Sequence, residues 1–160
     1  MRKVSLVAVI AVACPVIFGA TAFAQSANPA VGTWKLNVAK SKYAAGTPNK
    51  SGTTKIEAAG AGIKVTVDSV GGDGTKRHWT YTANTDGKDV PVTGNNPYGD
   101  VVAMTRVDAR TTRQIYKNHG KVTTTQTSAV SADGKTRTVT SKGTDARGQA
   151  IDGAAVYEKQ

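Results

Sequence analysis

Residues 63–68 read Ile63-Lys-Val-Thr-Val-Asp68, and this strict alternation of apolar and polar side chains decides the fold class. Successive side chains of an extended chain point to opposite faces, so the apolar residues share one face and the polar residues share the other. A period of two is typical of a strand that is buried on one face only. The segment is therefore predicted to be a half-buried β-strand.

Turn signals recur on both sides of this strand, at the spacing of about 8 to 12 residues that consecutive short strands produce. Asp-Gly pairs at 73–74, 86–87 and 133–134 place glycine where a tight hairpin demands a positive φ, and residues 145–148 form a longer version. Hairpins join antiparallel neighbours, so the chain is predicted to be all-β and antiparallel. The predicted strands cover residues 33–38, 53–58, 63–70, 75–83, 88–92, 101–107, 112–117, 121–130, 135–142 and 154–159.

An up-and-down meander of about eight to ten such strands leaves two unpaired edges unless the sheet closes on itself. A β-barrel is therefore expected, and a two-sheet sandwich is the alternative. Residues 39–52 are rich in Lys, Gly, Ala and Pro, and we expect them to form the longest irregular segment. No interior segment has the composition of a linker, so residues 25–160 are expected to form a single domain.

The first 24 residues have the three parts of a cleaved secretory signal. Residues 1–3 are a short basic head, residues 4–18 are almost continuously apolar, and Ala22-Phe-Ala24 provides the small residues of a cleavage site. The apolar run is shorter than the roughly 20 residues that span a bilayer, so we expect no transmembrane segment after cleavage. The predicted signal peptide, residues 1–24, indicates a periplasmic or secreted protein.

Cys14 is the single cysteine of the 160 residues, and it lies inside the predicted signal peptide. Lipid attachment at Cys14 is an alternative, but no leucine stands three residues before it and the apolar run continues beyond it. Without Cys14 the domain would have no disulfide, no thiol nucleophile and no cysteine ligand for zinc or an Fe-S cluster. We expect its core alone to hold it together.

The sequence contains no motif that predicts catalysis. His78 and His119 are 41 positions apart, and the chain has no Gly-x-Ser-x-Gly elbow, phosphate-binding glycine loop or His-Glu-x-x-His motif. Residues 71–74 are rich in glycine but lie between two predicted strands, which favours a turn. We therefore expect no cofactor, no metal and no enzymatic activity.

Both ends of the domain resemble small ligand-binding barrels. Gly32-Thr-Trp-Lys-Leu36 resembles the Gly-x-Trp opening of lipocalins and the opening of intracellular fatty-acid-binding proteins, and Val156-Tyr-Glu-Lys159 resembles the closing strand of the latter. With residues 86–94, the chain is similar to a small exported bacterial calycin-like family. The resemblance implies a lipocalin-like barrel and no particular ligand.

The resemblance also implies structural roles for three residues, but two features of fatty-acid-binding proteins are missing from this sequence. It implies that Gly32 lets the chain enter the barrel tightly, that Trp34 plugs the closed end and that Tyr157 belongs to the last strand. Fatty-acid-binding proteins usually hold the ligand carboxylate with Arg-x-Tyr on that strand, but here the arginine position is Ala155. Residues 39–52 also lack the apolar periodicity of the paired portal helices, so fatty-acid binding is not transferred.

Several arginines share a predicted strand face with apolar side chains, and they suggest a different anion site. Inside a barrel they would need an anionic partner, which a ligand carboxylate or phosphate supplies. The alternative is that their stems run over the edge of the core and their heads remain in water. The candidate ligand-binding residues are Arg77, Trp79, Tyr81, Met104, Arg106, Arg113, Tyr116 and Arg137.

The formal net charge of +10 raises the question of polyanionic partners. The basic residues are scattered over nearly every strand and loop, so nucleic acid is not expected, whereas loose association with an anionic envelope surface fits a diffuse positive field. Two functions remain open: a binding protein for a small amphipathic or anionic hydrophobic ligand, and an envelope surface protein whose barrel is filled by its own side chains. Polar residues on both faces of 121–128 favour a wet interior or an exposed sheet over a dry packed one.

Overall fold

The computed structural model describes residues 28–160, so the predicted signal peptide, including Cys14, lies outside the described residues. In this part the chain forms eleven strands and no helix. The strands are β1 (Gly32–Ala45), β2 (Ser51–Ala59), β3 (Gly62–Val70), β4 (Lys76–Ala83), β5 (Asp86–Pro91), β6 (Thr93–Gly94), β7 (Val101–Arg106), β8 (Thr111–Asn118), β9 (Lys121–Val130), β10 (Thr136–Thr144) and β11 (Ala150–Lys159).

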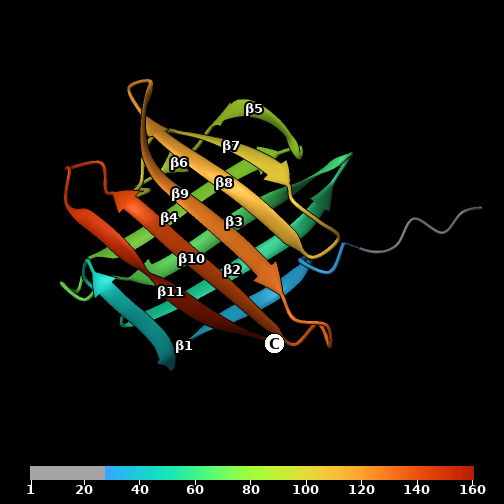
Figure 1. Cartoon of the computed structure of the whole chain (residues 1–160), viewed down its shortest axis with the longest axis horizontal. Helices are drawn as coiled ribbons and strands as arrows, with labels where there is room; N and C mark the ends of the chain where they lie inside the picture. Colours follow the sequence, from blue (N-terminus) through green and yellow to red (C-terminus); the bar gives the residue numbers. More distant parts are fainter. Residues whose placement is uncertain (1–27) are drawn as a thin grey trace, which may run out of the picture.

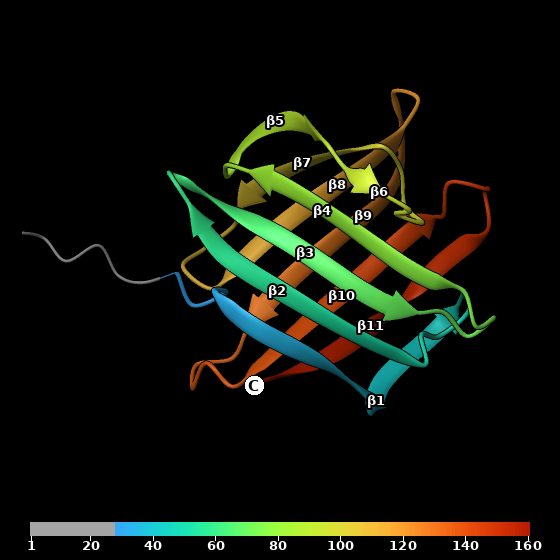
Figure 2. The same cartoon turned by 180° about the vertical axis from the view of Figure 1, so that it is seen from behind.

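All strand pairs are antiparallel, and together they form one sheet with the order β5-β7-β8-β9-β10-β11-β1-β2-β3-β4-β6. The first strand lies between β2 and the last strand, β11, so both ends of the domain meet in one place (Figures 1 and 2). Trp34 pairs with Lys159 there. This arrangement confirms the predicted antiparallel meander.

The sheet curls into a nearly closed barrel, and residues 86–94 make the closure. β5 pairs with β7, and β6 pairs with β4 through Trp79↔Gly94 and Thr80↔Thr93. Because β5 and β6 follow each other in the chain, this segment connects the two edges of the sheet (Figure 2). The sandwich alternative is therefore set aside in favour of the barrel.

The prediction that residues 39–52 are irregular was wrong for residues 39–45, which belong to β1, and for residues 51–52, which begin β2. β1 continues to Ala45, because a register shift between Asn37 and Lys42 lets it resume pairing with β11. The Ser41 hydroxyl supports this irregularity: it donates to the Asn37 carbonyl (2.8 Å) and accepts from the Val156 N–H (3.0 Å). The partner strand, which is distant in sequence, overrides the local composition here.

The core lies toward one end of the barrel. Trp34 is fully buried there, and its Nε1 donates to the Ala30 carbonyl at 2.8 Å. Lys159 lies over the Trp34 ring, with Nζ 5.1 Å from the ring centroid. Gly32 has a φ of 139°, a conformation that side chains rarely adopt. The expected burial of Trp34 is thus confirmed, and we call this end the closed end.

The other end carries the loops of residues 46–50, 71–75, 95–100 and 145–149, which lie at the left of Figure 1, together with the short turn of residues 119–120 between β8 and β9. We call it the open end. In a meander of antiparallel strands alternate loops gather at the same end, so the order of the strands alone places these segments together. They surround the entrance to the interior.

Candidate functional site

An internal cavity of about 140 Å³ lies between the closed end and these loops. Its walls come mainly from β3, β4, β8, β9, β10 and β11, and its entrance is lined by residues of the four open-end loops. The alternation of the strands explains this: on β4 the side chains of Arg77, Trp79 and Tyr81 all turn toward the cavity. We call this space the barrel cavity.

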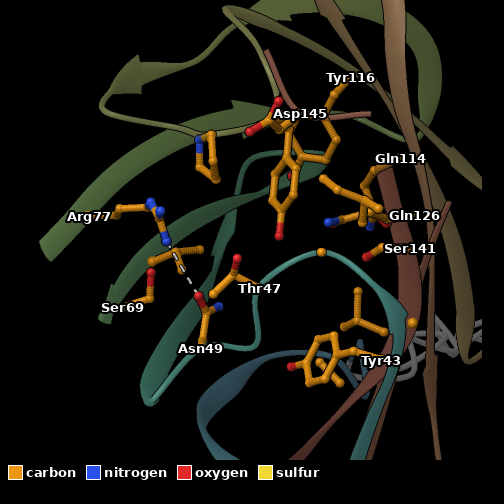
Figure 3. A pocket seen from close by; sticks show the side chains of 18 of the residues that line it. Tyr43, Thr47, Asn49, Ser69, Arg77, Gln114, Tyr116, Gln126, Ser141 and Asp145 are labelled. Atoms are coloured by element: carbon orange, nitrogen blue, oxygen red, sulfur yellow. Dashed lines mark hydrogen bonds between the residues drawn. The ribbon is translucent and has the colours of Figure 1, made fainter. Parts of the chain in front are cut away.

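The entrance of the barrel cavity contains charges that are already paired. The Arg77 guanidinium lies 3.4 Å from an Asp73 carboxylate oxygen and 3.5 Å from the Asn49 side-chain oxygen (Figure 3). Asp145 accepts hydrogen bonds from the backbone N–H groups of Arg147 and Gln149, both at 2.8 Å, and lies 3.2 Å from Nε of Arg147. Each acid at the entrance therefore has a basic partner.

Deeper in the cavity, Arg137 is in a different situation. Its side chain comes from β10, beside the closed end, and the residue is only 9% exposed. Its Nε donates to the Ser128 hydroxyl at 2.8 Å, and its guanidinium carbon lies 5.2 Å from the centroid of the Tyr157 ring. Among the residues of 28–160, no carboxylate lies within ion-pair distance of it.

Burial lowers the pKa of Arg137, while the neighbouring tyrosines Tyr157, Tyr81 and Tyr116 oppose that shift. A guanidinium nevertheless remains protonated in proteins. Arg137 therefore places a full positive charge in the interior with only neutral neighbours.

The polar atoms of the cavity are incompletely hydrogen-bonded. Within the described part of the chain, four buried side-chain atoms have no hydrogen-bond partner: Ser69 Oγ, Trp79 Nε1, Gln114 Oε1 and Arg137 Nη1. All four residues line the barrel cavity, although they come from four different strands. Buried polar groups in proteins are almost always satisfied, so their concentration around one cavity marks this cavity as the candidate site.

Aromatic side chains also line the cavity: Tyr43, Trp79, Tyr81, Tyr98, Tyr116 and Tyr157. The Trp79 and Tyr98 rings meet edge to face, with centroids 6.2 Å apart and planes at 87°, and Tyr98 lies 5.2 Å from Tyr116. Burial raises the pKa of Tyr81, Tyr116 and Tyr157 above the usual value, so their hydroxyls stay protonated at neutral pH. The interior therefore combines aromatic rings, hydroxyl groups and one unpaired cation.

The structure brings together five of the eight candidate ligand-binding residues. Arg77, Trp79, Tyr81, Tyr116 and Arg137 line the barrel cavity. Met104 is fully buried but packs in the core and does not line the cavity. Arg106 and Arg113 are exposed, and neither reaches it.

Strand geometry explains the two exposed arginines. On β8 the side chains of Gln114 and Tyr116 turn inward, so Arg113 must turn outward. Arg106 is the last residue of β7, and its exposed side chain matches the alternative in which the head remains in water. Neither residue can contribute to a site inside the barrel.

Gln114, Gln126 and Tyr98 also line the cavity and were not among the sequence candidates. Figure 3 shows Gln114, Gln126 and Ser141 together on the side of the pocket opposite Arg77 and Asn49. Gln114 and Gln126 are partners in the register of β8 and β9. For Gln126 the only signal was the polar character of both faces of 121–128, which does not reveal the inward face, and no local signal marked Gln114 or Tyr98.

Strand pairing brings an arginine next to Tyr157 inside the barrel. Arg137 is the register partner of Tyr157 across β10 and β11, so the two side chains are neighbours on adjacent strands. An arginine and a tyrosine therefore meet inside the barrel although Ala155 occupies the position two residues before Tyr157. This contact depends on strand register and has no signature in the local sequence.

In the part of the chain that the structure covers, no group of three or more His, Cys, Asp or Glu side chains is placed to hold a metal ion. Over the same residues, no helix is long and apolar enough to cross a bilayer. No known protein family matches the sequence, and no curated protein matches it significantly. Function must therefore be inferred from the site itself.

Proposed function

We propose that the protein is an exported, non-catalytic binding protein for a small organic anion, which it holds in the barrel cavity. The observation that carries this proposal is the buried Arg137, which no carboxylate of the described chain neutralises. A ligand carboxylate or phosphate would supply the missing partner.

An unpaired charge in the interior of a protein lowers the stability of the folded state. Burial of an isolated ion is expensive, and the Ser128 hydroxyl and the Tyr157 ring offset only part of that cost. An anion next to Arg137 would gain a charge-assisted hydrogen bond, a class about twice as strong as a neutral one. Binding would therefore relieve a penalty that the free protein bears.

The paired charges at the entrance support binding at depth over binding at the rim. Arg77 already contacts Asp73, and Arg147 already contacts Asp145. An anion would therefore gain less binding free energy at the entrance than at Arg137. The unpartnered donors of Trp79 and Ser69 lie on the path into the barrel. An anion entering from the open end would meet hydrogen-bond donors along its way.

The test is a calorimetric titration with matched pairs of carboxylic acids and their uncharged amides. The protein, purified from cells that express the complete sequence, should bind the carboxylates at least about tenfold more tightly than the amides, because charge-assisted hydrogen bonds contribute about 1.5–3 kcal/mol. Arg137→Gln should abolish this difference. The exposed Arg113→Gln is the matched control, because it removes the same charge outside the cavity.

Two results would contradict the proposal. The first is equal affinity for acids and amides in the unmodified protein, which would mean that Arg137 does not recognise charge. The second is the absence of binding by any small acid, which would favour a barrel filled by its own side chains with a role at the envelope surface.

A further inference from the structure

The volume of the barrel cavity restricts the size of the ligand. A cavity of about 150 Å³ holds one benzene molecule, and the barrel cavity measures about 140 Å³. Pockets for larger ligands usually have about 300–1,000 Å³. A long acyl chain is larger than this volume, whereas a single six-membered ring fits it.

The wall of the cavity favours a flat, aromatic ring. Trp79, Tyr98 and Tyr116 form a continuous series of rings with centroids 6.2 and 5.2 Å apart. Aromatic pairs in edge-to-face or offset geometry gain stabilisation beyond the burial of their surface. A ligand ring among these side chains would extend the series, and a saturated ring of similar size would not gain this contribution.

Gln114 provides a recognition group for a second point on the ligand. Its Nε2 donates to the Thr112 hydroxyl at 2.9 Å, while its Oε1 is buried and accepts no hydrogen bond in the described chain. An unpartnered amide oxygen requires a donor. The ligand should therefore carry a hydroxyl or an amino group in addition to its acidic group.

Strand pairing places this acceptor on the same wall of the barrel as Arg137. The Gln114 amide donates to Thr112, and Thr112 is the register partner of Ser128, whose hydroxyl accepts from Arg137 Nε. The acceptor on β8 and the cation on β10 therefore lie on either side of β9, where one substituted ring can present a group to each of them.

We infer that the ligand is a single-ring aromatic acid with one hydrogen-bond donor on the ring, its acidic group toward Arg137 and its donor toward Gln114. This inference rests on the proposed function, and it adds the chemical class of the ligand. The hydroxybenzoates are the simplest compounds with this chemistry.

The experiment compares five probes by calorimetric titration: 4-hydroxybenzoate, 3-hydroxybenzoate, benzoate, cyclohexanecarboxylate and decanoate. At least one hydroxybenzoate should bind about three- to tenfold more tightly than benzoate, the range expected for one added hydrogen bond. Benzoate should in turn bind more tightly than cyclohexanecarboxylate. Decanoate should be the weakest ligand.

Variants locate the two recognition points. Gln114→Leu should remove the preference for the hydroxybenzoate while leaving the affinity for benzoate within about twofold, and Arg137→Gln should weaken all acids. Gln114→Met is a second variant of similar volume, in case the leucine disturbs the fold, and thermal unfolding of each variant checks its integrity. Arg113→Gln should leave all five affinities unchanged.

The possible failures are distinguishable. If decanoate binds most tightly and its binding still requires Arg137, the aromatic inference is overturned and the proposed function remains. If both Gln114 variants still bind the hydroxybenzoate more tightly than benzoate, Gln114 does not accept a hydrogen bond from the hydroxyl group of the ligand. If no probe depends on Arg137, the proposed function itself fails.

Discussion

Arg137 occupies an interior position that a charged side chain rarely holds without a partner of opposite charge. Its neighbours are a hydroxyl, the ring of Tyr157 and the phenol groups of Tyr81 and Tyr116. None of these carries a negative charge at neutral pH, because burial raises the pKa of all three tyrosines. On the proposed function, the cost of this buried charge to the free protein is offset when an anionic ligand binds, which is the usual conflict between stability and function at a binding site.

Replacement of Arg137 tests this interpretation through stability. Arg137→Met removes the buried charge but keeps much of the volume, so the free energy of unfolding in the absence of ligand should stay equal or rise by about 1–2 kcal/mol. Urea denaturation measures it, with Arg113→Met as the exposed control, which should change it by less than about 0.5 kcal/mol. A loss of more than about 2 kcal/mol would mean that Arg137 holds the fold together, and would oppose a role reserved for ligand.

The hairpins were the elements most accessible to prediction. Asp73-Gly74 and Asp133-Gly134 form turns as predicted, with glycine φ values of 83° and 70°. The predicted hairpin at Asp86-Gly87 was wrong: both residues belong to β5, where the pairing with β7 shifts register, and β5 does not pair with β4. The apolar alternation of residues 63–68 is matched by the buried residues Ile63, Val65 and Val67. These features could be predicted because the residues of a turn determine its type, and the alternation of neighbouring side chains determines the buried face of a strand.

Elements that are polar on both faces could not be oriented from the sequence. The buried side of β9 consists of Thr124, Gln126, Ser128 and Val130, and its other side also carries threonines, so hydrophobicity does not distinguish them. The inward direction of Gln114 and Arg137 follows only from pairing with distant strands. For the same reason the site could be predicted on β4, where Trp79 and Tyr81 mark the buried face, and at Tyr116 on β8, but not at Gln114 and Gln126.

The closure of the barrel depends on a short element, β6. Gly94 has a φ of 106°, and a Cβ there would lie 2.2 Å from the His78 carbonyl oxygen, which accepts a hydrogen bond from the Asn95 N–H. Gly94→Ala should therefore weaken the pairing of β4 with β6 and destabilise the protein by about 1–3 kcal/mol.

Hydrogen exchange checks this effect, and the loss of amide protection should be concentrated on β4 and on residues 92–95. Gly74→Ala is the matched control, because Gly74 also has a positive φ but nothing within 4 Å of an added Cβ. Equal loss of protection in both variants, or none in Gly94→Ala, would contradict a specific role of this contact in closing the barrel.

At the scale of the whole molecule, the buried tyrosines link stability to alkaline pH. Burial raises the pKa of Tyr81 and Tyr116 in the folded protein, while in the unfolded chain these groups titrate near 10.0. Below that pH both states are protonated and the free energy of unfolding is unaffected. Above it the unfolded chain loses protons first, so stability should fall by about 1.4 kcal/mol per buried tyrosine for each pH unit.

Denaturation curves on both sides of pH 10.0, recorded together with tyrosinate absorbance, measure this linkage. The absorbance change of the buried tyrosines should coincide with unfolding. Ionisation of every tyrosine in a protein that stays folded would show that the cavity is freely hydrated, and it would remove the argument that Arg137 is surrounded by neutral groups.

The proposed function requires that the barrel cavity receives an anion at Arg137. Native mass spectrometry of the protein purified from cells that produce it, compared with the denatured chain, tests this most directly. We predict a defined excess mass of a small acid in the unmodified protein and in Arg113→Gln, and its loss in Arg137→Gln. Identical native and denatured masses, even after incubation with a mixture of small aromatic and aliphatic acids, would contradict the claim.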